Sequence, residues 1–280
     1  MTNRTYRNLG GSNILNNPNV SIRKITAALF FGFLMGAAAG LIGVGGGEFR
    51  IPILLYILGL PVITAIAVNL LIGLLTVLVS FLRRIQLKPL DRYAINVGLA
   101  MSIGSIGGAY LGALLTNKIP EKPLKRILAI FLVIIGLKIG LEPFIQIPFS
   151  PFKFTLNLWQ ETALAILIGI VIGIVSGTLG VAGGEFRIPA LIYLFSFDIV
   201  IAGTTSLLVS IPTVAMGFVK HHQMGHTNHG ATIIAVIMGI GSVLGALIGA
   251  SYANVIEQDI LKVLLGIILI LATVRMVTKP

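Results

Sequence analysis

The sequence predicts an all-α polytopic membrane protein of about eight transmembrane helices, built by tandem duplication of a four-span unit. Hydrophobic residues make up 56% of the 280 residues and charged residues only 10%, whereas a soluble domain contains about 25% charged residues. The apolar residues fall into runs long enough to cross a bilayer, and one glycine-rich motif occurs twice. This composition argues against a soluble enzyme, a nucleic-acid-binding domain and a disordered chain. We assign most of the net charge of +11 to segments that meet the lipid surface.

The duplicated motif reads GLIGVGGGEFRIPIL at 40–54 and GTLGVAGGEFRIPAL at 177–191, and 11 of its 15 positions are identical. The same constant offset aligns Met101 with Met238 without a gap. Two repeats related by a pseudo-two-fold axis, with a binding site between them, are a recurrent plan of transporters. We therefore predict a tail at 1–24, a first repeat at 25–146, a linker at 147–160 and a second repeat at 161–280.

Each repeat contains four long apolar runs and one short one. In the first repeat they lie at 25–45, 51–60, 62–82, 94–115 and 124–146, and in the second at 161–182, 188–197, 199–219, 231–252 and 260–278. The second run of each repeat is too short to span and predicts a half-helix that follows a glycine-rich break. Pro52 and Pro189 are expected in the first turn of these half-helices, where a missing N–H costs nothing.

The basic residues of the loops predict the orientation. With the N-terminus inside, the inner side collects thirteen Lys and Arg residues, including those of 83–92, and the outer side five. This distribution favours a cell-membrane protein with both termini in the cytoplasm and two repeats of the same sense. If each short run counts as a crossing, the repeats are inverted instead. The tail at 1–24 lacks the apolar core of a cleaved signal peptide.

The glycine motifs carry the candidate binding site. Glu48, Arg50, Glu185 and Arg187 are flanked by apolar sequence, and a charge at membrane depth costs about 2.5–3.5 kcal/mol, so that it is usually paired or functional. The N–H groups of a glycine run and the start of a half-helix suit an anion, and a guanidinium can bind two oxygens at once. The candidate substrate-binding residues are Arg50, Arg187, Glu48, Glu185, Gly45, Gly46, Gly47, Gly183, Gly184, Asn69, Thr205 and Ser206. The alternative is structural: the glycines let helices pack closely and each Glu pairs with its Arg.

The spans that follow the half-helices contain further polar residues. Asn69, Ser206 and the neighbouring Thr204 and Thr205 would complete the hydrogen bonds of a bound anion, or else bond to neighbouring helices. Pro212 lies inside the span 199–219 and predicts a kink there.

The motif resembles that of the TauE/SafE family of sulfite exporters and related organosulfur-anion permeases. The first copy runs from Gly43-Val44-Gly45-Gly46-Gly47 through Glu48-Phe49-Arg50 to Ile51-Pro52-Ile53-Leu54, and the second departs at Ala182. The resemblance covers about residues 25–278 and implies export or uptake of sulfite, thiosulfate, a sulfonate or a similar small anion. The Glu-x-Arg element departs from the family pattern, which leaves the substrate open among these anions.

Two other functions compete with anion transport. All four histidines, His221, His222, His226 and His229, lie in one window and suggest a transition-metal transporter. The first repeat has a basic loop at the corresponding place, and a basic loop that happens to use His explains the segments of both repeats without a metal. We expect neither a metal nor a cofactor. The second rival is a non-transporting membrane scaffold or assembly factor.

An enzyme is not expected, because the chain shows neither a nucleophile–base pairing nor a cofactor motif. A nucleotide-binding domain is absent from the sequence. We therefore expect a solute gradient to drive transport, with a proton or another ion as coupling partner. In this scheme Glu48 and Glu185 either orient the arginines or carry that proton.

Overall fold

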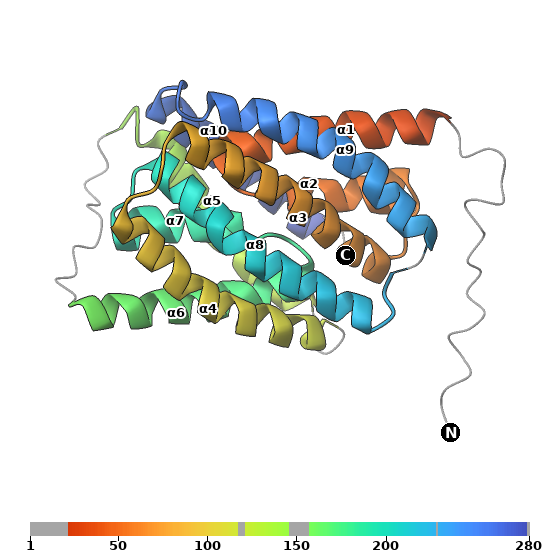
Figure 1. The fold of residues 1–280 in the computed structure, drawn as a ribbon, viewed down its shortest axis with the longest axis horizontal. Coiled ribbons are helices and arrows are strands. Elements are labelled where there is room, and N and C mark those ends of the chain that lie inside the picture. Colours follow the sequence, from red (N-terminus) through yellow and green to blue (C-terminus); the bar gives the residue numbers. More distant parts are fainter. Residues whose placement is uncertain (1–21, 117–120, 146–156, 228, 279–280) are drawn as a thin grey trace.

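The computed structural model describes residues 22–116, 121–145, 157–227 and 229–278, and this part of the chain is helical, without strands (Figure 1). The first half contains α1 (Ile22–Ile42), α2 (Gly47–Pro52), the π-helix η1 (Ile53–Ile57), α3 (Val62–Leu87), α4 (Arg92–Leu115) and α5 (Glu121–Leu141). The second half contains α6 (Leu158–Leu179), α7 (Gly184–Phe195), α8 (Ile199–Gln223), α9 (His229–Tyr252) and α10 (Gln258–Thr278).

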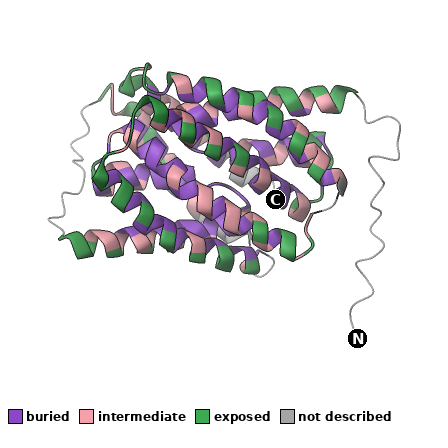
Figure 2. Cartoon of the chain, viewed as in Figure 1, coloured by how far each residue is buried: buried purple, intermediate pink, exposed green. Residues whose placement is uncertain are grey.

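Six of these helices are long and apolar enough to cross a membrane: α1, α3, α4, α6, α8 and α9. Their outward faces expose large apolar side chains, as on Ile103 of α4 and Leu167 of α6, while the faces turned inward are buried (Figure 2). Apolar residues facing outward are stable only in lipid, so the protein is a multi-pass membrane protein. The helices α5 and α10, 21 residues each, pack against each other.

The helix boundaries recur along the chain at the offset that separates the two motif copies. The helices α3, α4 and α5 begin at positions 62, 92 and 121, and their counterparts α8, α9 and α10 begin at 199, 229 and 258. The short helices α2 and α7 begin at 47 and 184, at the same interval. Packing crosses between the halves: α1 lies on α9, and α6 lies on α4 (Figure 1).

The two halves run in opposite senses. The basic residues favoured repeats of the same sense, but the helix contacts agree with the inverted alternative that the sequence left open. In the α3–α8 contact, Gly73 lies near Val214 and Gly217 near Leu70, so the residue numbers run in opposite directions and the two helices are antiparallel. The α5–α10 contact is antiparallel as well, because Gly136 approaches Leu269 whereas Gly140 approaches Gly266. Corresponding helices of the two halves are therefore inverted relative to each other.

The short helices cause this inversion. After α1, the segment α2–η1 turns back along α1: Gly46 lies beside Met35, and Leu54 joins a buried cluster with Ala28 near the start of α1. The helix α3 starts from the same end, since Ala65 belongs to that cluster. It then leads the connection 83–92 to the opposite end, where we had not expected it. The hairpin α1–α2–η1 therefore returns to its starting side. The three helices that follow, α3, α4 and α5, each cross the bundle, so the second half begins on the opposite side.

Small residues let the crossed helix pairs approach closely. A Cβ built on Gly108 of α4 would overlap the backbone oxygen of Ile170 in α6, whereas one on the neighbouring Gly107 would meet nothing within 4 Å. Residues without side chains at every fourth position allow such backbone contact between membrane helices. The glycines at these two interfaces are Gly32, Gly36, Gly40, Gly104, Gly108, Gly112, Gly169, Gly173, Gly177, Gly241, Gly245 and Gly249.

Side-chain caps fix the starts of three long helices. Asp91 accepts a hydrogen bond from the Ala94 N–H at the start of α4, and Asp198 accepts two at the start of α8. Asn157 and Gln160 form a reciprocal capping box at the start of α6. These polar ends satisfy N–H groups that the helix itself leaves unpaired.

Candidate functional site

Each glycine motif forms a sharp reversal followed by a short helix. Three positive φ angles occur between α1 and α2, at Gly43 (96°), Gly45 (90°) and Gly46 (67°). A side chain would strain such backbone, which explains why this segment is glycine-rich. In the second motif Gly180 and Gly183 have φ of 71° and 78°.

The short helices begin earlier than the sequence predicted. Because they start at Gly47 and Gly184, each glutamate and arginine lies on the helix rather than in the glycine break. Pro52 therefore lies at the end of α2 instead of in its first turn, and the chain continues as the π-helix η1. Pro189 lies inside α7, which stays α-helical.

The two reversals contact each other at the centre of the molecule. A Cβ on Gly184 would lie 2.6 Å from the Cα of Val44, and one on Gly47 would lie 3.3 Å from the Cα of Val181. Hydrogen bonds join the halves at the same place. The Asn69 Nδ2 donates to the Gly180 carbonyl at 2.7 Å, and the Ser206 hydroxyl donates to the Gly43 carbonyl at 3.2 Å.

The two glutamates meet between the reversals. Glu48 and Glu185 are the second residues of α2 and α7, with 8% and 2% of their surface exposed. Their carboxyl groups interact directly with each other. Within the described residues neither carboxylate lies within ion-pair distance of an arginine, and one oxygen of each makes no hydrogen bond.

Arg50 is fully buried and held on several sides. Its Nε donates to the Asn69 Oδ1 at 3.0 Å, and its Nη2 donates to the Gly45 carbonyl at 2.6 Å. Its Nη1 donates to the hydroxyls of Thr76 at 2.9 Å and Ser242 at 3.0 Å. This guanidinium links α2 to α3 and to α9 of the other half.

Arg187 occupies the equivalent position in the second half but has fewer partners. Its Nη1 donates to the Ser206 carbonyl at 3.1 Å and to the Ser210 hydroxyl at 2.7 Å. Its Nε and Nη2 are buried and make no hydrogen bond within the described chain. The Ser210 position corresponds to Gly73 in the first half. Arg187 and Arg50 share no hydrogen-bond partner among the described residues.

The remaining predicted polar residues lie on α3 and α8. Asn69 and Ser206 lie at the centre, as described. Thr205 is buried with its methyl group facing Gly98 of α4, and its hydroxyl makes no hydrogen bond within the described residues. The Thr204 hydroxyl donates a hydrogen bond to the Val200 carbonyl, one turn earlier in α8. The helix α8 continues through Pro212 without interruption.

Sequence reasoning missed Thr76, Ser210 and Ser242. Thr76 lies two helical turns after Asn69 along the same face, and this spacing is visible in the sequence. Ser242 reaches Arg50 from the other half of the chain, and no local pattern indicates it.

Arg84, assigned by sequence to a basic loop, is also fully buried inside α3. It donates to the Val200 carbonyl at 3.1 Å and faces Asp198 at the start of α8.

The histidine window does not form a metal site among the described residues, where no three His, Cys, Asp or Glu side chains are arranged around a point. His221 is buried, with its Nε2 3.2 Å from the Gly177 carbonyl and its Nδ1 2.9 Å from the Nδ1 of His226. Burial lowers the pKa of His226 below its usual 6.5. His222 pairs with Thr227, and the side chain of His229 lies outside the described residues.

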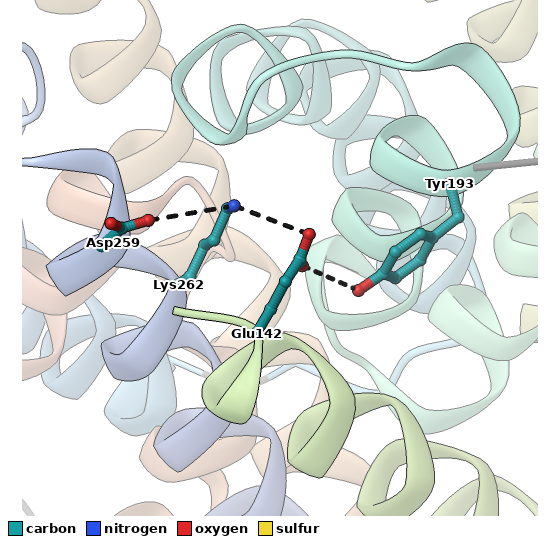
Figure 3. Close-up of polar contacts among 4 residues, drawn as sticks. All are labelled: Glu142, Tyr193, Asp259 and Lys262. Carbon is teal, nitrogen blue, oxygen red and sulfur yellow. Dashed lines mark hydrogen bonds and ion pairs between the residues drawn. The ribbon is translucent and has the colours of Figure 1, made fainter. Parts of the chain in front are cut away.

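A polar network ties α7 to α5 and α10 (Figure 3). The Tyr193 hydroxyl on α7 lies 3.4 Å from the Glu142 carboxylate, and Lys262 lies 3.7 Å from Glu142 and 4.0 Å from Asp259. The Lys138 ammonium lies 3.3 Å from the centre of the Tyr193 ring. The short helix that carries Arg187 is therefore linked to the α5–α10 pair through side chains near the end of α7.

Comparison with known proteins identifies the family. The sequence profile described as "Sulfite exporter TauE/SafE" matches residues 6–139 and 159–280. The chain belongs to the TauE/SafE family. The predicted family is therefore confirmed over both halves, and the protein is a member of a membrane transporter family.

Several curated proteins are similar over most of their length. "Probable membrane transporter protein YunE" of Bacillus subtilis is 26% identical over 258 residues, covering 86% of this chain and 92% of the relative. "Probable membrane transporter protein ORF9" of Sinorhizobium is 29% identical over 262 residues, covering 91% of both chains. A relative from Methanocaldococcus jannaschii, MJ0441, is 25% identical over 254 residues, covering 86% of this chain and 91% of its own. No solved structure matches the chain significantly.

Proposed function

We propose that this TauE/SafE protein is a secondary transporter of a small sulfur-containing oxyanion such as sulfite, thiosulfate or a sulfonate. One observation carries the proposal beyond the family: the fully buried guanidinium of Arg187 keeps N–H groups that have no hydrogen-bond partner among the described residues. A buried charge with unsatisfied donors is costly unless something binds it. A planar guanidinium matches the oxygens of a small oxyanion.

The inverted architecture supports an alternating-access mechanism. We infer that the chain arose by duplication, since helix starts recur at one constant interval, and that α5 and α10 complete a set of eight spans. In inverted repeats, one arrangement of the halves exposes the central site to one side of the membrane, and exchanging their conformations exposes it to the other. A movement of one half against the other would change the contact between the two glycine-rich reversals.

The glutamate pair supports a role in coupling. Two carboxyl groups buried against each other cannot both carry a charge without repulsion, so the pair can hold a proton between them. We propose that Glu48 and Glu185 take up one proton when the site is open to one side and release it on the other. This fits their contact with each other better than a role in orienting the arginines.

The positions of the helix ends and of the basic residues near them indicate the orientation in the membrane. The helix α1 begins and α10 ends at the same end of the bundle, and the exposed Arg23 and Lys24 lie at the start of α1. Because basic residues concentrate on the cytoplasmic side, we propose that both termini face the cytoplasm and that the protein lies in the cell membrane.

Reconstitution tests this function. Purified protein in liposomes is assayed for uptake of sulfite, thiosulfate and a small sulfonate, with and without a pH gradient. We expect wild type to carry at least one of them, and an Arg50→Gln/Arg187→Gln double variant to carry none. A Glu48→Gln/Glu185→Gln variant should retain anion exchange but lose its response to the pH gradient.

The control variant is Gly107→Ala, which changes an exposed position with open space around it. Absence of flux for every anion in correctly inserted wild type contradicts the proposal and favours a scaffold. Flux of a transition metal that depends on His221 and His226 would instead establish the metal rival.

A further inference from the structure

The two arginines of the repeated motif are not equivalent. We propose that the anion binds at Arg187 alone, and that Arg50 is a structural anchor whose anion-binding edge is already occupied by the protein itself. This inference rests on the proposed transport of an oxyanion and assigns the binding site within it.

The argument concerns the edge of the guanidinium formed by Nε and Nη2. Its two parallel N–H groups can bind two oxygens of one oxyanion. In Arg50, the Asn69 Oδ1 accepts from Nε at 3.0 Å and the Gly45 carbonyl accepts from Nη2 at 2.6 Å. Two protein oxygens therefore occupy the positions that the oxygens of an anion would take.

In Arg187 the same edge has no protein acceptor within the described part of the chain. Both of its hydrogen bonds leave from Nη1, while Nε and Nη2 remain unpaired and buried. One sequence difference accounts for much of this: the position of Asn69 is Ser206 in the second half, and the shorter serine directs its hydroxyl to Gly43 instead. The unpaired edge is the structural counterpart of the edge that Asn69 and Gly45 fill.

The start of α7 lies beside this edge, and so does the Glu185 carboxyl, which interacts with the Arg187 guanidinium. The Nη2 of Arg187 lies 3.5 Å from the position that a Cβ on Gly183 would take, so the guanidinium folds back to the start of α7. The helix α7 has 12 residues and no side-chain cap, and the partial positive charge of its N-terminus adds to that of the arginine. Across from Gly183 lie Ile172 and Ser176 of α6. The proposed site therefore lies at the packed contact between α6 and the start of α7.

The test rebuilds the first half's contact in the second. Ser206→Asn places an amide oxygen beside Arg187 at the position equivalent to Asn69, and so fills the edge without removing the arginine. Binding of thiosulfate and sulfite to the purified full-length protein is measured by titration calorimetry, and flux in liposomes. We expect Ser206→Asn to weaken binding by about 10- to 100-fold, because it removes one or two charge-assisted hydrogen bonds.

A second variant keeps the test decisive if Ser206→Asn folds poorly. Arg187→Lys preserves the charge but lacks the planar edge, and we expect a similar loss of affinity in protein that retains its thermal midpoint. Gly107→Ala serves as the matched control, with wild-type affinity. If wild type binds an anion and both variants bind it equally well, the assignment to Arg187 is wrong while anion transport stands. If wild type neither binds nor carries any anion, the proposed function and this inference both fail.

Discussion

The stability of the two arginine sites gives a prediction that needs no knowledge of the substrate. Replacing Arg50 by lysine keeps the charge but concentrates the donors on one nitrogen, whereas the native side chain uses three nitrogens to reach its four acceptors. The hydroxyls of Thr76 and Ser242 also donate to backbone carbonyls and stay bonded. The Asn69 Oδ1 or the Gly45 carbonyl then loses its donor.

A buried acceptor without a donor costs about 1–3 kcal/mol, and we expect Arg50→Lys to lower the free energy of unfolding by about that amount. Arg187→Lys should cost less than about 1 kcal/mol, because its two hydrogen bonds leave from one nitrogen and an ammonium can make both. At about 2–4 °C per kcal/mol, the Arg50 variant should unfold several degrees lower. The assay is thermal unfolding in detergent, followed by circular dichroism at one scan rate. An Arg187→Lys variant that loses as much stability as Arg50→Lys would refute the reasoning.

Three further predictions follow from the fold. Gly108→Ala forces α4 and α6 apart and should lower the free energy of unfolding by about 1–3 kcal/mol, whereas Gly107→Ala should leave it equal or raise it by up to about 1 kcal/mol; equal effects would contradict the packing. Because burial lowers the pKa of His226 from 6.5, the folded protein takes up its proton less readily than the unfolded chain. The thermal midpoint should therefore be highest above pH 6.5 and fall as the pH is lowered through this value, and His226→Gln should reduce that fall. Glu142→Gln removes a half-exposed ion pair and the partner of Tyr193, and should cost less than about 1 kcal/mol; a larger loss would show that the network in Figure 3 is a principal anchor of α7.

Much of the fold is readable from the sequence because the bilayer imposes simple constraints. A chain with 10% charged residues and long apolar runs can bury its backbone polar groups in lipid only as helices. The positive φ angles of Gly43, Gly45 and Gly46 require residues without side chains, so the reversal is marked by composition alone. Asp91, Asn157 and Asp198 likewise mark helix starts, because their side chains accept hydrogen bonds from backbone N–H groups of the first turn.

The sense of the repeats is not readable in this way. Hydropathy gives the length of an apolar run but not its direction, and a short run such as 51–60 can either cross or turn back. Leu54 shares a buried cluster with Ala28, which shows that α2–η1 turns back along α1. This reversal inverts the second half and moves the connection 83–92 to the opposite end. Those two residues belong to different helices, and only packing brings them together.

The sequence by itself determined that this is a helical membrane protein of the TauE/SafE type, with two glycine-rich reversals and a charged pair after each. These properties depend on composition and on residues close in the chain. The tertiary structure decided how the two motifs differ, because most partners of each arginine come from other helices. Ser242 reaches Arg50 across 192 positions of sequence, and Ser206 turns its hydroxyl to the opposite reversal. Two nearly identical segments therefore have different hydrogen-bonding capacity, which only their surroundings define.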